Sequence, residues 1–151
     1  MTNKIDHPLQ SIIIIYVSRF LLPFIFAFGI YVQINSSDSP GGGFQAGVLM
    51  ASALILHSIV FGAPSTLRVL PFRYLLSLAC FGMSLYLLTG TVSSLFGKTF
   101  LDYGVFTNKF IEPHLAQELG IFLVELGVGI AVFSTICIIY YSFIQRGARK
   151  K

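Results

Sequence analysis

Charged residues are scarce in this sequence, and acidic ones most of all: six Asp and Glu stand beside ten Lys and Arg in 151 residues. A soluble domain is typically about a quarter charged, whereas here 11% of residues are charged and 55% are hydrophobic. A chain of this size cannot hide so much apolar surface in a soluble core. The composition therefore excludes an ordinary soluble domain and predicts an integral membrane protein.

Residues that support common chemistries are also missing. The chain has two cysteines, Cys80 and Cys137, each inside an apolar run with no second thiol nearby, so we expect both to act as small hydrophobic residues. We find no nucleophile motif, paired His/Asp chemistry or metal-ligand cluster, which disfavours a stand-alone enzyme. We expect no cofactor and no metal, and the net charge of +4 requires no nucleic-acid partner.

Long apolar segments dominate what is present. Because about 20 mostly apolar residues cross the hydrocarbon of a bilayer, we predict an all-α bundle of about four transmembrane helices within one membrane domain, residues 1–151. The first apolar run has no signal-peptide cleavage pattern, so we expect an uncleaved anchor. The residues between the spans form short connecting segments, one of them residues 63–72. The predicted spans are 9–34, 44–62, 73–96 and 115–143.

The basic residues indicate how the bundle is oriented. Four spans place both termini on one side of the membrane, and seven basic residues flank the spans on that side, against two on the other. Basic residues favour the cytoplasmic side, so we predict cytoplasmic termini. The two groups are Lys4, Arg68, Arg73, Arg146, Arg149, Lys150 and Lys151, and Lys98 and Lys109.

A glycine-rich motif opens the second span. Pro40, Gly41, Gly42, Gly43 and Phe44 suit a tight approach to a helix start, where free N–H groups could face an anion. The Lys-Ser/Thr pair of a nucleotide-binding loop does not follow the glycines. The motif therefore favours packing over phosphate binding.

Small residues recur along two of the predicted spans at spacings that place them on one helix face. Such stripes let helices approach each other closely in membranes. We predict close helix contacts at both stripes, some of them with other subunits. The stripes are Gly43, Gly47 and Ala51 in the second span, and Gly120, Gly127, Ala131 and Ser134 in the fourth.

Four ionisable residues, Arg19, His57, Glu118 and Glu125, lie in or near the spans and are candidates for an ion path or relay. The two glutamates share a helix face about 10 Å apart, away from the small residues. Glu125 is either a proton or cation relay or a static pair, and Glu118 favours a solvated or capping role. His57 favours a local hydrogen bond over proton shuttling, and Arg19 favours reaching back to the headgroups.

Three segments of the sequence resemble the MnhB/MrpB family, which supplies one of the small membrane components of the multisubunit Mrp-type Na⁺/H⁺ antiporter of prokaryotes. They are Arg19–Phe24 in the first span, Ser39–Gly47 at the second, and Glu118–Gly129 in the fourth. The resemblance extends over nearly the whole chain. It implies four spans and a place in the cell membrane.

The resemblance also implies a function and partners. It predicts a small, non-enzymatic subunit of a complex that exchanges Na⁺ for H⁺, with the other antiporter subunits and the lipid bilayer as its surroundings. The main ion path is expected in the large antiporter-like subunits. The alternative is a membrane subunit of an ion-pumping membrane-bound hydrogenase or a related redox complex.

Overall fold

The computed structural model describes residues 8–36, 42–95, 101 and 113–149. The all-α prediction is confirmed for these residues. The ends of the predicted spans agree closely with the four long helices, except that the last helix continues past residue 143 to Arg149. The helices are α1 (Pro8–Ile34), α2 (Gly43–Phe61), α3 (Ala63–Val69), α4 (Phe72–Leu95) and α5 (Pro113–Arg149).

The predicted connecting segment over residues 63–72 is mostly helical, because α3 occupies it. Gly62 ends α2 with a φ of 89°, a conformation that glycine adopts without strain. Pro64 then stands in the first turn of α3, where a proline needs no hydrogen-bond partner for its nitrogen. The two prolines of this segment therefore lie at the two ends of a short helix, since Pro71 follows shortly after it.

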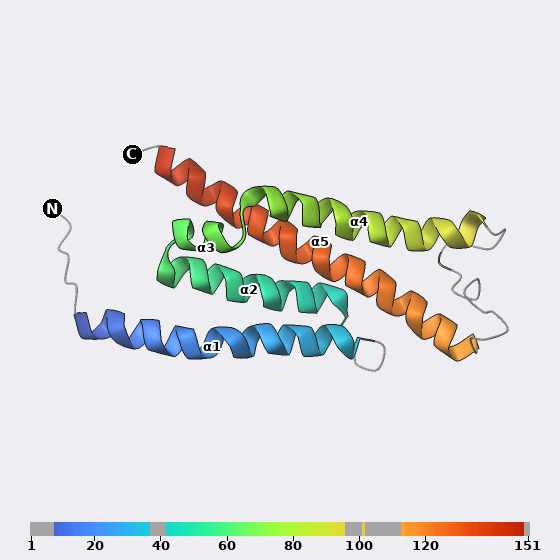
Figure 1. Ribbon diagram of the computed structural model, residues 1–151, viewed down its shortest axis with the longest axis horizontal. Helices are drawn as coiled ribbons and strands as arrows, with labels where there is room; N and C mark the ends of the chain where they lie inside the picture. The colour runs from blue at the N-terminus through green and yellow to red at the C-terminus, as the bar shows by residue number, and fades with distance from the viewer. Residues whose placement is uncertain (1–7, 37–41, 96–100, 102–112, 150–151) are drawn as a thin grey trace.

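The long helices pack in the order α1, α2, α5, α4. Helix α5 contacts both α2 and α4, and α1 packs mainly on α2. Figure 1 shows that α1 begins and α5 ends at the same end of the bundle, and that α3 lies beside α2 there. All four long helices are apolar and long enough to cross a membrane. This arrangement agrees with termini on a shared side, and the cytoplasmic assignment of that side stays a prediction.

The predicted close helix contacts are present, and the chain makes them with itself. A Cβ atom placed on Gly47 of α2 would lie 2.6 Å from the carbonyl oxygen of Gly129 in α5. A Cβ atom on Gly82 of α4 would lie 2.7 Å from the carbonyl oxygen of Gly127 in α5. Gly47 and Gly127 thus face neighbouring helices of the same chain, so another subunit would have to use a different surface from these two glycines.

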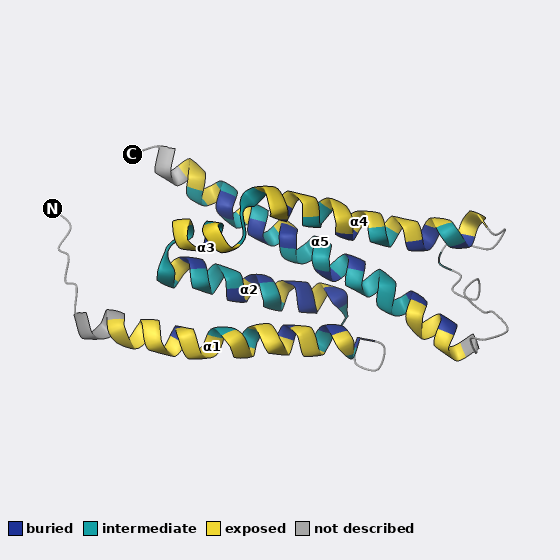
Figure 2. Cartoon of the chain, in the orientation of Figure 1, coloured by how far each residue is buried: buried dark blue, intermediate teal, exposed yellow. Residues whose placement is uncertain are grey.

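Helix α1 offers such a surface. Most of its length is exposed (Figure 2), and its outward side chains include Phe20, Phe24, Phe28 and Tyr31. The buried core lies instead among α2, α4 and α5, at Ala51, Leu75, Cys137 and Tyr141. An exposed row of large apolar side chains suits contact with lipid or with another membrane helix.

Candidate functional site at the start of α2

The Glu125 side chain lies against the glycine-rich start of α2. A Cβ atom on Gly42 would lie 2.8 Å from Glu125 Oε1, and a Cβ atom on Gly43 would collide with the Glu125 carbonyl oxygen. The second carboxylate oxygen, Oε2, is buried and has no hydrogen-bond partner within the part of the chain that the structure describes. Only glycine leaves room for this carboxylate to approach the α2 backbone so closely.

Gln33 of α1 reaches the same place. Its side chain is 6% exposed, and its amide oxygen touches the position where Gly129 would carry a Cβ atom. That position is also 3.1 Å from the carbonyl oxygen of Gly43. Since Gly129 is one helical turn after Glu125, Gln33 and Glu125 flank the same stretch of α2. We call Gln33, Gly42, Gly43, Glu125 and Gly129 the α2 junction.

Some buried polar atoms at the α2 junction, and one just after Gln33 in the chain, have no hydrogen-bond partner within the described part of the structure. Both amide atoms of Gln33, and the hydroxyl of Ser36 three residues later, are buried without a hydrogen bond to any described residue. Buried polar groups are nearly always hydrogen-bonded in proteins. The junction is therefore a place where a water molecule, an ion or a polar group from another chain would complete the bonding. Sequence reasoning missed Gln33, although an amide inside an apolar span is the kind of signal that could have found it.

The electrostatics of the α2 junction favour negative charge. The first N–H groups of a helix have no partner inside the helix, and the aligned peptide dipoles place partial positive charge there. No side chain caps the start of α2, because the N-cap residue is Gly42. The Glu125 carboxylate, supplied from α5, is the acidic group at this position. The Glu125 carboxylate thus lies beside the start of α2, and its Oε2 has no hydrogen-bond partner among the described residues.

The other residues that the sequence predicted as site residues do not join the α2 junction or lie outside the described residues. Pro40 and Gly41 lie outside the described residues. Phe44 is exposed at the start of α2, and Gly120 is buried on α5. Glu118 and Arg19 are exposed. The structure therefore brings Glu125 and the glycines together and leaves Glu118 and Arg19 apart from them.

The predicted local hydrogen bond of His57 is present. Its Nδ1 lies 2.7 Å from the hydroxyl oxygen of Thr66 on α3, and Thr66 is fully buried. This bond joins α3 to α2, and Tyr141 of α5 is buried against α3 as well. His57, Thr66 and Tyr141 thus form a second group of polar residues, at the end of the bundle where α5 ends. It lies about 24 Å from Glu125, by the rise of an α-helix between Glu125 and Tyr141.

A Thr66→Val substitution is expected to destabilise the chain by about 1 kcal/mol, because it keeps the shape of the side chain but leaves the His57 ring without its partner. The thermal midpoint of the detergent-solubilised protein measures this. Thr91→Val is the matched control, since the Thr91 hydroxyl is exposed and bonds only to carbonyls of its own helix. Equal midpoints for the two variants would contradict a role for the His57–Thr66 bond.

Comparison with known proteins identifies the family. Residues 13–138 match the family described as a domain related to the MnhB subunit of Na⁺/H⁺ antiporter. The chain belongs to the MnhB family. The match includes most of α1, all of α2, α3 and α4, and the part of α5 that holds Glu125 and Gly129. Four apolar helices in an MnhB family member describe a multi-pass membrane protein.

Individual members of the MnhB family align with most of the chain. A Staphylococcus saprophyticus protein, named as the putative antiporter subunit mnhB2, is 31% identical over 84% of this chain and 94% of its own length. An Alkalihalophilus pseudofirmus protein, whose name assigns it as a Na⁺/H⁺ antiporter subunit, is 29% identical over 80% of this chain and 88% of its own length. A Bacillus subtilis protein of the same name is 29% identical over 74% and 82%, respectively.

Proposed function

We propose that this chain is a small, non-enzymatic membrane subunit of a multisubunit Na⁺/H⁺ antiporter, assembled with other antiporter subunits in the cell membrane. Family membership supports this assignment, because the relatives named above are antiporter subunits and align along most of their length. The four apolar helices supply the membrane anchorage that such a subunit needs. The hydrogenase alternative gains no support from these relatives.

The observation that carries a more specific role is the buried oxygen of Glu125, which has no partner among the described residues. Ionisable residues are costly within a membrane and usually mark ion paths or buried pairs. We propose that Glu125 exchanges a proton or a cation with a neighbouring group at the α2 junction. Gln33 is a polar side chain from another helix whose amide atoms have no partner among the described residues, so it would orient the group that Glu125 meets.

The α2 junction and the His57–Thr66 pair are separated by close packing of small residues. Between them the α2–α5 interface is closed by Gly47 against the Gly129 backbone, and by Ala51, which is fully buried. Neither residue has a polar side chain that could pass an ion or a proton onward. A path that uses Glu125 would therefore have to be completed by another subunit, in agreement with a role inside an assembly.

Glu125→Gln tests this role, because it keeps the size of the side chain and removes the charge that exchanges a proton. We expect Na⁺/H⁺ antiport by the assembled complex to fall by about two orders of magnitude, a loss in the range that acid–base groups contribute to proton transfer. The measurement is the Na⁺-dependent collapse of a pH gradient in everted membrane vesicles. Quantitative detection of all co-purified subunits shows that the complex has assembled.

Glu118→Gln is the matched control, since Glu118 shares the helix with Glu125 but is exposed. We expect its antiport rate and pH profile to equal those of the wild type. An unchanged rate and pH profile for Glu125→Gln would reject the relay and leave Glu125 as a static charge that caps α2. Co-purified iron–sulfur subunits in place of antiporter subunits would instead reject the antiporter assignment.

A further inference from the structure

An apolar pocket of about 290 Å³ lies between α1, α2 and α3, toward the opposite end of α2 from the α2 junction. Helices α1 and α2 form two of its walls, and α3 covers its end. The lining is almost entirely apolar, and only two of its residues, His57 and Thr66, have polar side chains. The lining residues are Leu22, Pro23, Phe26, Ala53, Leu54, His57, Thr66 and Val69.

The walls of this pocket exclude water as a stable occupant. Apolar cavities stay dry unless several polar groups bind the water, and here Thr66 is already engaged by His57. The pocket lies along the last turns of α2, between Ala53 and the helix end at Phe61. In a membrane this depth is close to the headgroup region, where acyl chains begin. A lipid tail meets the requirement of an apolar occupant at this depth.

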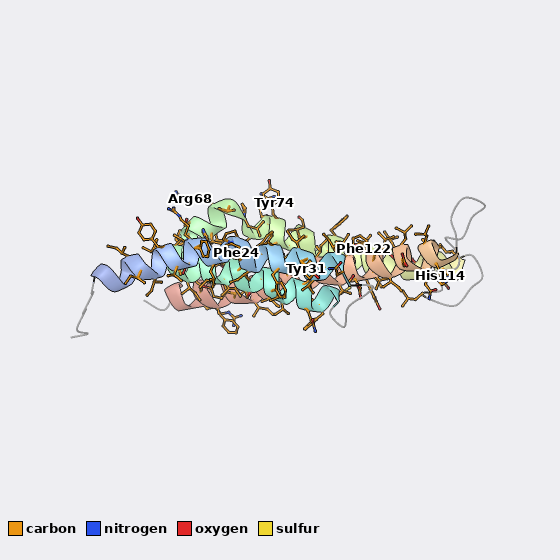
Figure 3. All side chains as sticks on the ribbon, turned by 90° about the horizontal axis from the view of Figure 1, so that it is seen from below. Phe24, Tyr31, Arg68, Tyr74, His114 and Phe122 are labelled. Atoms are coloured by element: carbon orange, nitrogen blue, oxygen red, sulfur yellow. The ribbon has the colours of Figure 1, made fainter. Side chains whose placement is uncertain are left out.

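Two arginines are near lining residues of the pocket along the chain. Arg19 is exposed on α1, one helical turn before Leu22 and Pro23 and on the same face. Arg68 is exposed on α3, next to Val69. Figure 3 shows the Arg68 side chain standing out from the bundle near the end at which α1 begins. Long arginine side chains can reach from such positions to the headgroups while their stems stay in apolar surroundings.

His57 adds a polar contact inside the pocket. Its Nδ1 is engaged by Thr66, which leaves Nε2 as the ring nitrogen that can bond to a ligand. None of the residues that form α1, α2 and α3 is acidic, so these helices offer the two arginines no carboxylate to pair with. An apolar cavity that contains one imidazole nitrogen, with two exposed cations on the helices that form it, is complementary to an amphiphile with a negative headgroup.

We propose that this pocket is a binding site for an anionic phospholipid, with an acyl chain between Leu22, Leu54 and Val69 and the phosphate between Arg19 and Arg68. His57 Nε2 bonds to the ester region below the phosphate. Basic pockets between membrane helices bind anionic headgroups in this way. The site is independent of antiport, since neither arginine touches the α2 junction. It also gives the exposed arginines and α3 a shared role.

The absence of tryptophan from the chain allows a direct test. Val69→Trp places a single fluorescent reporter at the pocket edge, where Val69 is 73% exposed. The full-length variant is reconstituted in phosphatidylcholine vesicles with a rising fraction of brominated phosphatidylglycerol, which quenches tryptophan on contact. We expect quenching to saturate at a low phosphatidylglycerol fraction. Phe143→Trp is the matched reporter, because Phe143 is 70% exposed on α5 and one turn from Arg146, and its quenching should rise only with random contact.

Arg19→Gln and Arg68→Gln are then added to the Val69→Trp chain, first singly and then together. We expect the phosphatidylglycerol fraction at half-quenching to rise about fivefold for each arginine and about thirtyfold for both, up to the level of random contact. Arg73→Gln with Arg146→Gln is the control pair, since both arginines are exposed and line other cavities. That pair should cause no shift. Gel filtration and helical circular dichroism establish that each variant is folded.

Three results would overturn the proposal. The first is identical quenching curves for the Val69→Trp and Phe143→Trp reporters. The second is equal quenching by brominated phosphatidylcholine, which would make the pocket a groove that any tail fills. The third is loss of all lipid quenching at Val69→Trp when the full chain is purified with its co-assembled subunits, which would assign the pocket to a protein helix.

Discussion

Gly43→Ala is expected to disrupt the packing of α2 on α5, although it adds a single methyl group. The new Cβ atom would overlap the carbonyl oxygen of Glu125 and would stand 3.0 Å from the Glu125 Cα atom. These are backbone atoms of a long helix, so neither can turn aside as a side chain would. We expect a loss of about 3 kcal/mol or more, the upper end of the cost of overpacking. The measurement is the thermal midpoint after extraction in mild detergent.

The same substitution should also abolish antiport in the assembled complex, because moving α2 away from α5 removes the helix N-terminus from the Glu125 carboxylate. Ser52→Leu is the control, since Ser52 is on α2, is exposed and bonds only within its own helix. It adds more volume than Gly43→Ala and should change neither the midpoint nor the antiport rate. A Gly43→Ala protein with the midpoint and activity of the Ser52→Leu protein would refute the contact between Gly43 and Glu125.

Gly82→Leu is expected to separate α4 from α5. A Cβ atom on Gly82 would lie 2.6 Å from the Ala131 nitrogen and 2.7 Å from the Gly127 carbonyl oxygen. A leucine adds three further carbons to that overlap, and close helix approach at small residues is a main source of helix association in membranes. We expect a loss of about 3 kcal/mol or more. Hydrogen exchange should show the loss of protection beginning in α4.

Ser84→Leu on the exposed face of α4 is the companion variant, and it should leave hydrogen exchange unchanged. Because α4 and α2 pack on α5 as separate neighbours, Gly82→Leu chains that remain folded should keep the protection of α1 and α2. Simultaneous loss of protection in α2 would show that the bundle melts as one unit. Full protection of α4 would contradict the close packing of Gly82 on α5.

The small-residue stripes show how far sequence patterns reach. Their spacing predicts that Gly43, Gly47 and Gly127 meet another helix, because only small residues permit that approach. The spacing contains no information about which helix it is. The fold assigns Gly43 and Gly47 to α5 and Gly127 to α4. The expected contacts of these stripes with other subunits thus remain without support, since the chain itself fills them.

Glu125 and Gln33 show the same limit for the candidate site. A lone glutamate in an apolar span stands out in the sequence, so its importance is predictable from the cost of placing charge in lipid. What it faces is not predictable, because Gln33 and Gly42 come from segments far earlier in the chain and meet Glu125 only when α1, α2 and α5 pack. The orientation of Gln33 toward Gly129 depends on the same packing.

By itself, the sequence determined the number, type and approximate bounds of the long helices, because crossing a bilayer imposes a length and an apolar composition that any window of the sequence reveals. It also singled out Glu125 and the glycines. Only the tertiary structure decided that α3 is a helix, that α5 lies between α2 and α4, and that Glu125 meets the start of α2. These features depend on contacts between residues far apart in the chain, and the apolar pattern of each helix is too uniform to specify its neighbours.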